Sequence, residues 1–516
     1  MKYYLLSIAK KHGINIAILI ILFVISIIIR KPYIDRPISH NFEWSTAHSL
    51  IVQQVWFEEG AVKNLFAQKM NFKNEADKFI NNASMSNNYD EYPLGIDDSY
   101  FYLSNSSFGL IPPYLIFKLF NVYPSPLLIE WFNMFLQLAC SIVLYLIIER
   151  KTRIDNQPFN IAATVAGAVY LLLPTTLWFH SNVYYIEMFV QLPFVLTVFF
   201  TSLYFDETIS SKKNIFLYLL SLCLMLTVLT EWLGILLGAC IFLYTCTQWK
   251  KGLDFKLLFF VASAVLLGAS IFIMQNSLVV GFSNFINHEL RQFIYQSNSL
   301  DNLDVQEKAD YHIIWNNYLN GASAVFYLIF ASAIGALSKI KWHDFRQRFG
   351  IILFLFLLPC LLHHILLSRF TTIHWFSILK SIFFLGSLLA TFVYYNQFLY
   401  STKLKFNIIF LLFIISLAPM TYHNYLYHAT TGGNPHHYEI WANAVIDHAN
   451  NDEVVFWVSQ EEPRPQLIYY ARRNIKRVDS IKDAKRWLKE SETKAKKGIA
   501  FTNLPLKKFI RFSVEK

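Results

Sequence analysis

The feature that most constrains this chain is a series of apolar runs, each about as long as a membrane is thick. A helix needs roughly 20 apolar residues to cross a hydrocarbon core of about 30 Å. Charged residues make up only 16% of the 516-residue chain, well below the quarter or so that is typical of soluble domains. The sequence therefore predicts a polytopic α-helical membrane protein with about eleven spans, at residues 13–29, 127–148, 159–177, 187–205, 214–229, 234–248, 255–274, 321–338, 350–367, 376–398 and 406–422.

Basic residues are concentrated in alternate connections between these runs, around residues 2–11, 150–153, 212–213, 250–256, 339–348 and 403–405. The three short connections on the other side contain only one basic residue, Arg369. Because connections rich in Lys and Arg stay in the cytoplasm, we expect a cytoplasmic N-terminus and, with eleven spans, an external C-terminal segment. Orientation and lipid headgroups account for the net charge of +10, so we predict membrane lipids and no nucleic acid as partners.

Three long segments are then expected outside. In the first, at residues 30–126, an apolar piece at 108–117 is too short to span and predicts an interfacial helix. The second is 275–320. The third is 422–516. We predict that it forms a separate C-terminal domain, which follows a membrane domain at 1–421. It alternates strand patterns at 453–458, 475–478 and 498–501 with helix patterns at 465–473 and 481–490, which predicts a small parallel α/β layer.

The five cysteines lie inside apolar runs, with no CxxC or CxxH pair, so neither a disulfide nor a zinc site is indicated. His363, His364 and His374 have no adjacent carboxylate at the spacing of a known metal motif. We therefore predict no metal ligands and no cofactor.

The clusters of polar side chains that could take part in catalysis or binding all lie at the ends of the apolar runs that face away from the cytoplasm. Ionisable residues near lipid are costly to hold and usually have a function, so this gathering predicts one active site at the outer membrane face. The candidates are His40, Glu43, Trp44, His180, Tyr184, Tyr185, Glu187, Glu231, Arg291, Arg369, His374 and Lys380.

The acidic candidates have two interpretations each. Glu43, beside aromatic residues, suits a general base for an acceptor hydroxyl or amine, or it stabilises the first turn of a helix. Glu187 at the start of the fourth span allows the same two interpretations. Glu231 lies in a tight connection, where a structural hydrogen bond across the turn is as good an explanation as a catalytic role.

The basic candidates suit an anion. Arg369 is flanked by Ser368, Thr371 and Thr372, a setting in which a guanidinium can hold a phosphate by charge-assisted hydrogen bonds. Lys380 can approach the same anion or extend outward to the interface. Arg291, in the second long outer segment, is a further candidate.

Taken together, these motifs resemble the GT-C membrane glycosyltransferases, which include the protein O-mannosyltransferases and the lipid A aminoarabinose transferase. The resembling segments occur in the family's order, at 40–60, 174–191, 230–234 and 364–380. The resemblance implies inverting transfer of a sugar from a polyprenyl-phosphate donor to a cell-envelope acceptor at the outer face of the cytoplasmic membrane. It also implies that Glu43 is the base and Glu187 the second acid.

The chain departs from that pattern in two places. At the motif position in the first outer segment the chain has Glu43 with a histidine nearby, where the mannosyltransferases have an Asp-Glu pair, and the stretch 100–109 has no double proline before its glycine. A monophosphate leaving group needs only a cation such as Arg, whereas a pyrophosphate donor would require a divalent metal.

Two other functions compete with this one. A lipid-linked sugar flippase or transporter predicts charges near the centres of the spans and inverted repeats, and neither is visible. An O-antigen polymerase or ligase would gather several arginines in a late outer loop, whereas 275–320 holds only Arg291 and Lys308.

Overall fold

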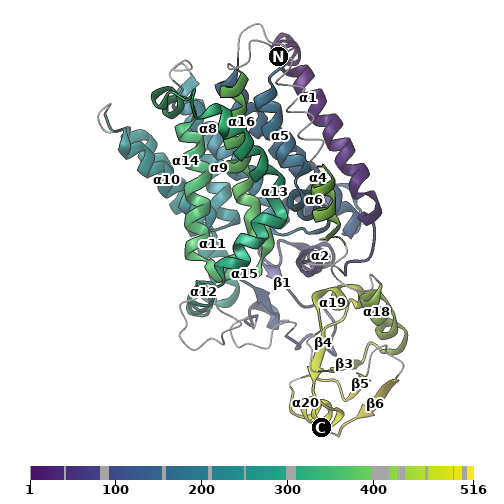
Figure 1. Cartoon of the computed structure of the whole chain (residues 1–516). Helices are drawn as coiled ribbons and strands as arrows, with labels where there is room; N and C mark the ends of the chain where they lie inside the picture. The colour runs from purple at the N-terminus through teal and green to yellow at the C-terminus, as the bar shows by residue number, and fades with distance from the viewer. Residues whose placement is uncertain are drawn as a thin grey trace.

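The computed structural model describes residues 2–39, 42–81, 92–153, 159–206, 212–248, 252–297, 309–397, 418–427, 429, 436–459, 463–491, 493–502 and 508–515. A bundle of long helices occupies one half of the molecule and a small sheet domain lies at one end of it (Figure 1). The bundle consists of α1 (Lys2–Arg30), α4 (Pro126–Thr152), α5 (Ile161–Leu172), α6 (Pro174–Asn182), α7 (Ile186–Phe189), α8 (Gln191–Tyr204), α9 (Lys213–Thr230), α10 (Leu233–Thr247), α11 (Phe255–Val280), α13 (Tyr311–Ala336), α14 (Trp342–Leu366) and α16 (Leu379–Gln397).

The chain is a multi-pass membrane protein. Among the described residues, eight helices are long and apolar enough to cross a bilayer, or nine if the bent pair α5–α6 is one span. A further predicted span corresponds to α10, which is shorter, and the last, 406–422, lies mostly outside the described residues. The predicted count of eleven therefore stays a prediction.

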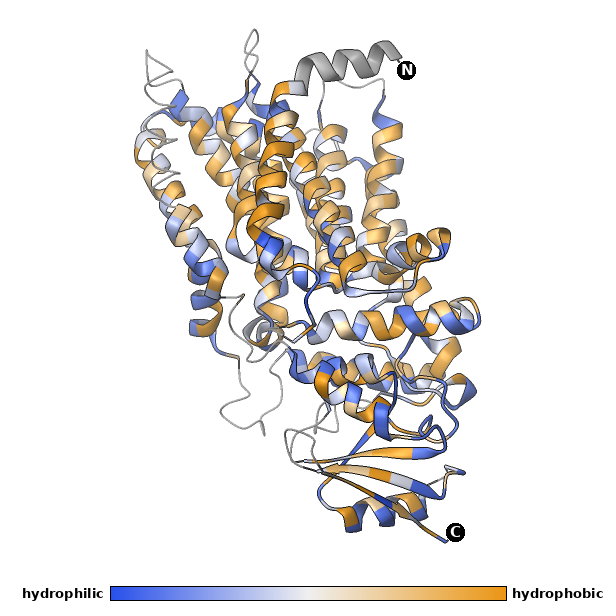
Figure 2. Cartoon of the chain, turned by 90° about the vertical axis from the view of Figure 1, so that its right-hand side faces the viewer, coloured by the Kyte–Doolittle hydropathy of each residue, from blue (hydrophilic) through white to orange (hydrophobic). Residues whose placement is uncertain are grey.

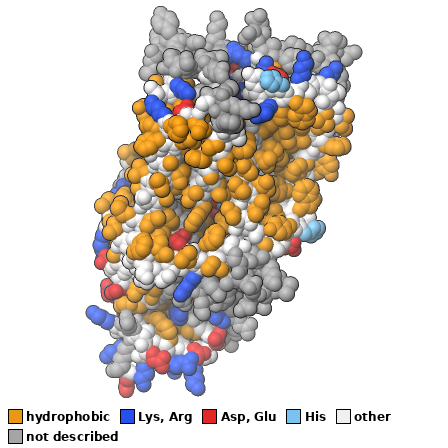
Figure 3. Space-filling model, turned by 90° about the vertical axis from the view of Figure 1, so that its left-hand side faces the viewer, with side chains coloured by type: hydrophobic (Ala, Val, Ile, Leu, Met, Phe, Trp, Pro, Cys, Tyr) orange, Lys and Arg blue, Asp and Glu red, His pale blue; other side chains and the backbone are white. Residues whose placement is uncertain are grey.

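Hydropathy is distributed along the bundle as a membrane requires. The helices are apolar through their middle (Figure 2), and the surface carries a belt of apolar side chains with most charged side chains beyond it (Figure 3). Exposed basic residues, including Lys212, Lys341 and Arg348, lie in connections at the end of the bundle opposite to the sheet domain. This asymmetry agrees with the orientation expected from the basic connections.

The predicted span 159–177 is broken into α5 and α6, which are bent by 54°. Pro174 begins α6 and cannot donate a hydrogen bond to the helix before it. Gln137 of α4 donates to the carbonyls of Tyr170 and Leu171 at 3.1 and 3.2 Å, and Arg30 donates to the carbonyl of Leu177 at 2.9 Å. The break therefore exposes no unpaired carbonyl at these positions, and it turns α6 toward the sheet-domain end.

The outer segments form a layer between the bundle and the sheet domain (Figure 1). The first contributes α2 (Trp44–Val55), a π-helical turn (Trp56–Gly60), the short strand pair β1 (Gln68–Lys69) and β2 (Phe101–Tyr102), and α3 (Ile111–Phe120). The predicted short apolar piece at 108–117 is helical, and α3 exposes Leu115, Leu119 and Phe120, as an interfacial helix does. The later outer segments contribute α12 (Phe282–Gln296) and α15 (Ser368–Ile373).

The C-terminal region is an α/β layer. It contains α18 (His437–His448), β3 (Glu453–Val458), α19 (Pro465–Ala471), β4 (Ile475–Val478), α20 (Ile481–Glu490), β5 (Lys497–Thr502) and β6 (Lys508–Ser513). The strand order is β4-β3-β5-β6, and β3 pairs in parallel with both β4 and β5, so the predicted parallel strands are confirmed. The sequence did not predict α18 or the antiparallel edge strand β6.

Buried polar contacts join this domain to the first outer segment. The amide of Asn474 donates to the carbonyl of Phe72 at 3.1 Å, Arg473 forms an ion pair with Asp77 at 2.5 Å, and the Thr493 hydroxyl donates to the carbonyl of Ala76 at 2.8 Å. Removing one partner of a buried ion pair is strongly destabilising. The domain is therefore fixed in place over the outer layer.

Candidate active site

A cavity of about 380 Å³ lies where the bundle meets the outer layer. Its walls come from α2, residues 92–105, residues 185–187, residues 231–232, α12 and residues 363–374, and the C-terminal domain adds Pro465. Six of the predicted site residues line it: Trp44, Tyr185, Glu187, Glu231, Arg369 and His374. The structure thus brings together polar groups from four different connections, as the gathering of polar clusters predicted.

Glu187 is presented by the first turn of α7, just after the extended residue Tyr185. Its side chain is buried, and Oε2 has no hydrogen-bond partner among the described residues. Glu231 and Lys380 both lie within electrostatic range of it. A carboxylate in a cavity-lining residue, with one oxygen that has no hydrogen-bond partner, is suited to accept a proton from a bound group.

Glu231, which lines the cavity, contacts two basic side chains. Lys380 of α16 forms an ion pair with Oε1, and Nε2 of His363 lies 2.9 Å from the same oxygen. Lys380 Nζ and His363 Nε2 are themselves 3.0 Å apart. Burial alone would raise the pKa of Glu231, but Lys380 and His363 outweigh burial and lower that pKa below its usual range. Glu231 is therefore ionised, and Lys380 is engaged with it rather than exposed in the cavity.

Arg369 is a buried cation in the cavity wall. It lies on α15, its guanidinium carbon is 3.5 Å from the ring centroid of Tyr295 on α12, and Nη1 donates to the carbonyl of Tyr295 at 3.4 Å. Stacking on an aromatic ring fixes the plane of a guanidinium, and the N–H groups along the edge of that plane can bind oxygen atoms.

His374 and Trp44 form an aromatic contact on the same cavity, with ring centroids 6.0 Å apart. The ring of His374 also stacks on Phe370 at 4.3 Å, and Nδ1 donates to the carbonyl of Phe370 at 3.1 Å. Burial lowers the pKa of His374 to about 4, so its ring is neutral at physiological pH.

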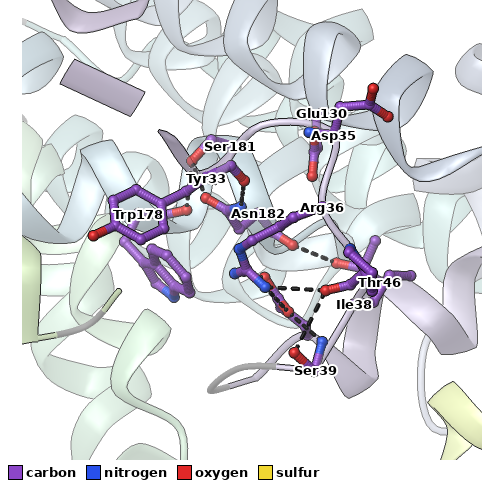
Figure 4. Close-up of polar contacts among 12 residues, drawn as sticks. Tyr33, Asp35, Arg36, Ile38, Ser39, Thr46, Glu130, Trp178, Ser181 and Asn182 are labelled. Carbon is purple, nitrogen blue, oxygen red and sulfur yellow. Dashed lines mark hydrogen bonds and ion pairs between the residues drawn. The ribbon is translucent and has the colours of Figure 1, made fainter. Parts of the chain in front are cut away.

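Glu43 does not line the cavity. It is buried in a bidentate ion pair with Arg36, and the backbone N–H of Ser39 donates to its Oε2 at 2.7 Å. Nearby, Thr46 donates to the carbonyl of Asn182 at 2.8 Å and so ties α2 to the end of α6 (Figure 4). These contacts describe a structural anchor, and the role of Glu43 as the base stays a prediction.

Three further predicted residues, His180, Tyr184 and Arg291, do not line the cavity. His180 is buried in the core, with Nδ1 3.1 Å from Asn133 Oδ1 and Nε2 2.9 Å from the Tyr170 hydroxyl. Tyr184 anchors the outer layer, because its hydroxyl donates to the carbonyl of Gly109. Arg291 is exposed on α12, and His40 lies outside the described residues.

Several cavity residues were not predicted, among them His48, Tyr102, Asn105, His288 and Glu289. His48 follows Trp44 by four positions, so both lie on one face of α2, and that spacing was a usable signal. Burial raises the pKa of Glu289 to about 8. His288 is 3.3 Å from the hydroxyl of Ser104, a partner that no sequence pattern indicates.

A second, apolar pocket of about 190 Å³ adjoins the cavity. Asn105, Glu231, Trp232 and Glu289 line both spaces. The remaining lining residues come mainly from α9, α10, α11 and α12 and include Val228, Ile235, Ala269, Phe272 and Ile286. A cavity lined by ionisable side chains therefore adjoins an apolar pocket at the level of the membrane helices.

The described residues contain no group of three or more His, Cys, Asp or Glu side chains arranged to hold a metal ion. Of the carboxylates that line the cavity, Glu231 forms an ion pair with Lys380, and Glu187 is within electrostatic range of both of these residues.

Neither a protein-family model nor a curated protein matches this sequence. Solved structures do match it. ArnT from Cupriavidus metallidurans, bound to undecaprenyl phosphate, matches with a TM-score of 0.59 at 11% identity, over 95% of this chain and 92% of that one. The archaeal oligosaccharyltransferase AglB from Archaeoglobus fulgidus, in complex with an inhibitory peptide and a dolichol-phosphate, matches with a TM-score of 0.59 at 10% identity, over 94% of this chain and 69% of that one.

Both of these proteins are GT-C membrane glycosyltransferases. At such low identity the likeness concerns the fold, and it extends over nearly the whole chain. The resemblance found in the sequence motifs is confirmed at this level: the chain has the fold of the GT-C membrane glycosyltransferases.

Proposed function

We propose that this protein transfers a sugar from a polyprenyl-phosphate donor to a cell-envelope acceptor (a glycolipid, polysaccharide or protein) at the outer face of the cytoplasmic membrane. The observation that carries the proposal is a cavity lined by ionisable side chains that adjoins an apolar pocket between membrane helices. A lipid-linked sugar has the same two parts, a polar head and an apolar tail. The ligands named for the two matching structures, undecaprenyl phosphate and dolichol-phosphate, are of this class.

The cavity residues suggest how an inverting transfer would proceed. Glu187 removes the proton from an acceptor hydroxyl or amine, and the acceptor attacks the anomeric carbon on the face opposite to the phosphate. The bond between that carbon and the phosphate oxygen breaks, and the phosphate leaves with the electron pair. We assign Glu187 this role because it lines the cavity and its Oε2 has no hydrogen-bond partner among the described residues, whereas Arg36 and Ser39 hold Glu43.

Arg369 is the cavity cation best placed for the departing phosphate. Negative charge on that phosphate increases as the bond breaks, and a fixed guanidinium in a low-dielectric site stabilises the increase. Lysine keeps the charge and loses the planar fork. Arg369→Lys should therefore retain more transfer activity than Arg369→Ala.

The test uses the purified chain in lipid vesicles with a set of polyprenyl-phosphate sugars and envelope extract as acceptor. Release of polyprenyl phosphate, measured by mass spectrometry, should depend on both the protein and the extract. Unchanged donor with every sugar would contradict the proposal. Movement of intact donor across the vesicle membrane would favour a flippase instead.

A further inference from the structure

One wall of the cavity is built from five contiguous aromatic rings, Trp44, His48, Tyr92, Tyr102 and Tyr185, which we call the aromatic wall. The imidazole of His48 is at its centre. Its centroid lies 4.7 Å from Tyr102, 5.9 Å from Tyr185 and 6.4 Å from Tyr92. Trp44 extends the wall through Tyr185, at 6.4 Å. All five side chains line the cavity.

The tyrosine hydroxyls of this wall already have partners. The Tyr185 hydroxyl donates to the Tyr102 oxygen at 2.6 Å, and the amide of Asn105 donates to both oxygens at 3.1 and 3.3 Å. These contacts hold the two rings in fixed orientations. The wall is therefore preorganised, which reduces the entropy lost when a ligand binds.

His48 is the exception. It is only 2% exposed, and neither ring nitrogen has a hydrogen-bond partner among the described residues. Burial lowers the pKa of His48 to about 3, so the ring is neutral and offers one donor and one acceptor. Leaving a buried polar group unpaired costs free energy of folding. A ligand that supplies the missing hydrogen bonds would recover that cost.

We propose that the aromatic wall is the subsite for an uncharged sugar ring and that His48 selects among sugars by hydrogen bonding to ring hydroxyls. This inference rests on the proposed glycosyl transfer. A sugar presents an apolar C–H face, which packs on aromatic rings, and a rim of hydroxyls that both donate and accept. The rings of the aromatic wall suit the C–H face, and the neutral imidazole of His48 suits the hydroxyls. Such a lining, mainly aromatic with a few polar groups, is typical of small-molecule sites.

The absence of charge in the wall determines the class of sugar. None of its five side chains carries a charge, whereas the ionised lining residues Glu231 and Arg369 belong to other segments. A carboxylate on the sugar would lose its hydration against these rings and gain no cation in return. Uronic acids are therefore disfavoured.

The test compares lipid binding to the full chain in nanodiscs. The probes are polyprenyl phosphate alone and polyprenyl phosphate linked to glucose, galactose, mannose, N-acetylglucosamine or glucuronic acid. We expect the wild type to bind at least one uncharged sugar donor more tightly than polyprenyl phosphate alone. His48→Phe should weaken that donor about 10-fold, the value of one or two hydrogen bonds, with polyprenyl phosphate alone unaffected. His48→Gln, which retains a donor and an acceptor, should keep part of the preference.

Thermal unfolding separates this role from a structural one. His48→Phe removes an unpaired polar group without breaking an internal hydrogen bond, so its melting temperature should equal or exceed that of the wild type. The matched control is His312→Phe, at an exposed histidine of α13 that borders neither pocket, and it should change neither measurement.

Two results would overturn the inference alone: unchanged sugar preference in His48→Phe, or tightest binding of the glucuronic acid donor. In both cases binding of polyprenyl phosphate would leave the proposed function standing. Failure of the wild type to bind any of these lipids would instead refute the proposed function, and the sugar subsite with it.

Discussion

The oxygens of Glu187 and Glu43 differ in what surrounds them. Glu187 lines the cavity and its Oε2 has no hydrogen-bond partner among the described residues, while Arg36 and Ser39 contact the oxygens of Glu43. A carboxylate already held by a guanidinium is a weak base, because the pair stabilises its ionised form. Neutralising Glu187 and neutralising Glu43 are therefore expected to have different effects on activity and on stability.

Glu187→Gln should lower the rate of transfer by about 10²–10⁴-fold, the usual worth of a general base, with the melting temperature nearly unchanged. Glu43→Gln should mainly lower the melting temperature, because it removes the negative charge that the partly buried Arg36 pairs with. Transfer rates and unfolding curves of both variants check this. A full loss of activity in a stable Glu43→Gln variant would return the role of base to Glu43.

The buried histidines make stability depend on pH. Burial lowers the pKa of His48 to about 3 and that of His374 to about 4, whereas an unfolded histidine titrates at about 6.5. Below pH 6.5 the unfolded chain binds protons that the folded chain excludes, so the free energy of unfolding falls as the pH falls.

Between pH 6.5 and 5, His48 alone should account for a loss of about 1.5 kcal/mol. The difference in unfolding free energy between those two pH values, measured in detergent for the wild type and for His48→Phe, should be smaller in the variant by that amount. An identical pH dependence would mean that His48 is protonated in the folded chain.

At the scale of elements, the bend between α5 and α6 depends on α4. The Gln137 side chain pairs with the last carbonyls of α5 and also accepts from Arg30, all within the buried core. Gln137→Leu should reduce the free energy of unfolding by about 1–3 kcal/mol, because buried carbonyls and a guanidinium N–H lose their partner. Gln347→Leu, at an exposed position of α14, is the matched control, and equal stability of the two variants would show that the bend needs no such support.

Elements with a strong local pattern were predictable from the sequence. The apolar runs of α4, α9 and α11 and the strand–helix alternation of the C-terminal domain determine those elements locally. The break at Pro174 carried a signal, but an apolar run on both sides of it favoured one continuous span. The edge strand β6 does not fit the alternation of strands and helices from which the other strands were predicted. It pairs with β5 in antiparallel fashion, and this pairing is a tertiary contact. No local pattern reports such contacts.

For the site, sequence reasoning identified the correct end of the molecule but not the full set of residues. Positive-inside asymmetry and the spans place Trp44, Glu187, Glu231 and Arg369 at one end, where the cavity lies. The same reasoning included Glu43, His180 and Lys380, because an ionisable or aromatic side chain has the same sequence signature whether it borders a cavity or is paired behind it. Burial and partners are properties of the folded chain.

For the whole molecule, orientation in the membrane follows from the charge asymmetry. In a chain whose five native cysteines are replaced, Lys494→Cys in the C-terminal domain should react with a membrane-impermeant maleimide added to intact cells. Lys212→Cys, at the opposite end of the bundle, should react only after the cells are permeabilised. The reverse result would place the cavity on the cytoplasmic side.

The measurement that tests the central claim most directly is mass spectrometry of the sugars attached to envelope lipids, polysaccharides and proteins, in cells with and without this chain. Removal of the chain should eliminate one sugar from one acceptor and cause the corresponding polyprenyl-phosphate sugar to accumulate. The wild-type chain should restore that sugar, and Glu187→Gln, present at the same level in the membrane, should not. An unchanged set of envelope sugars, with no accumulation of any lipid-linked donor, would contradict the account.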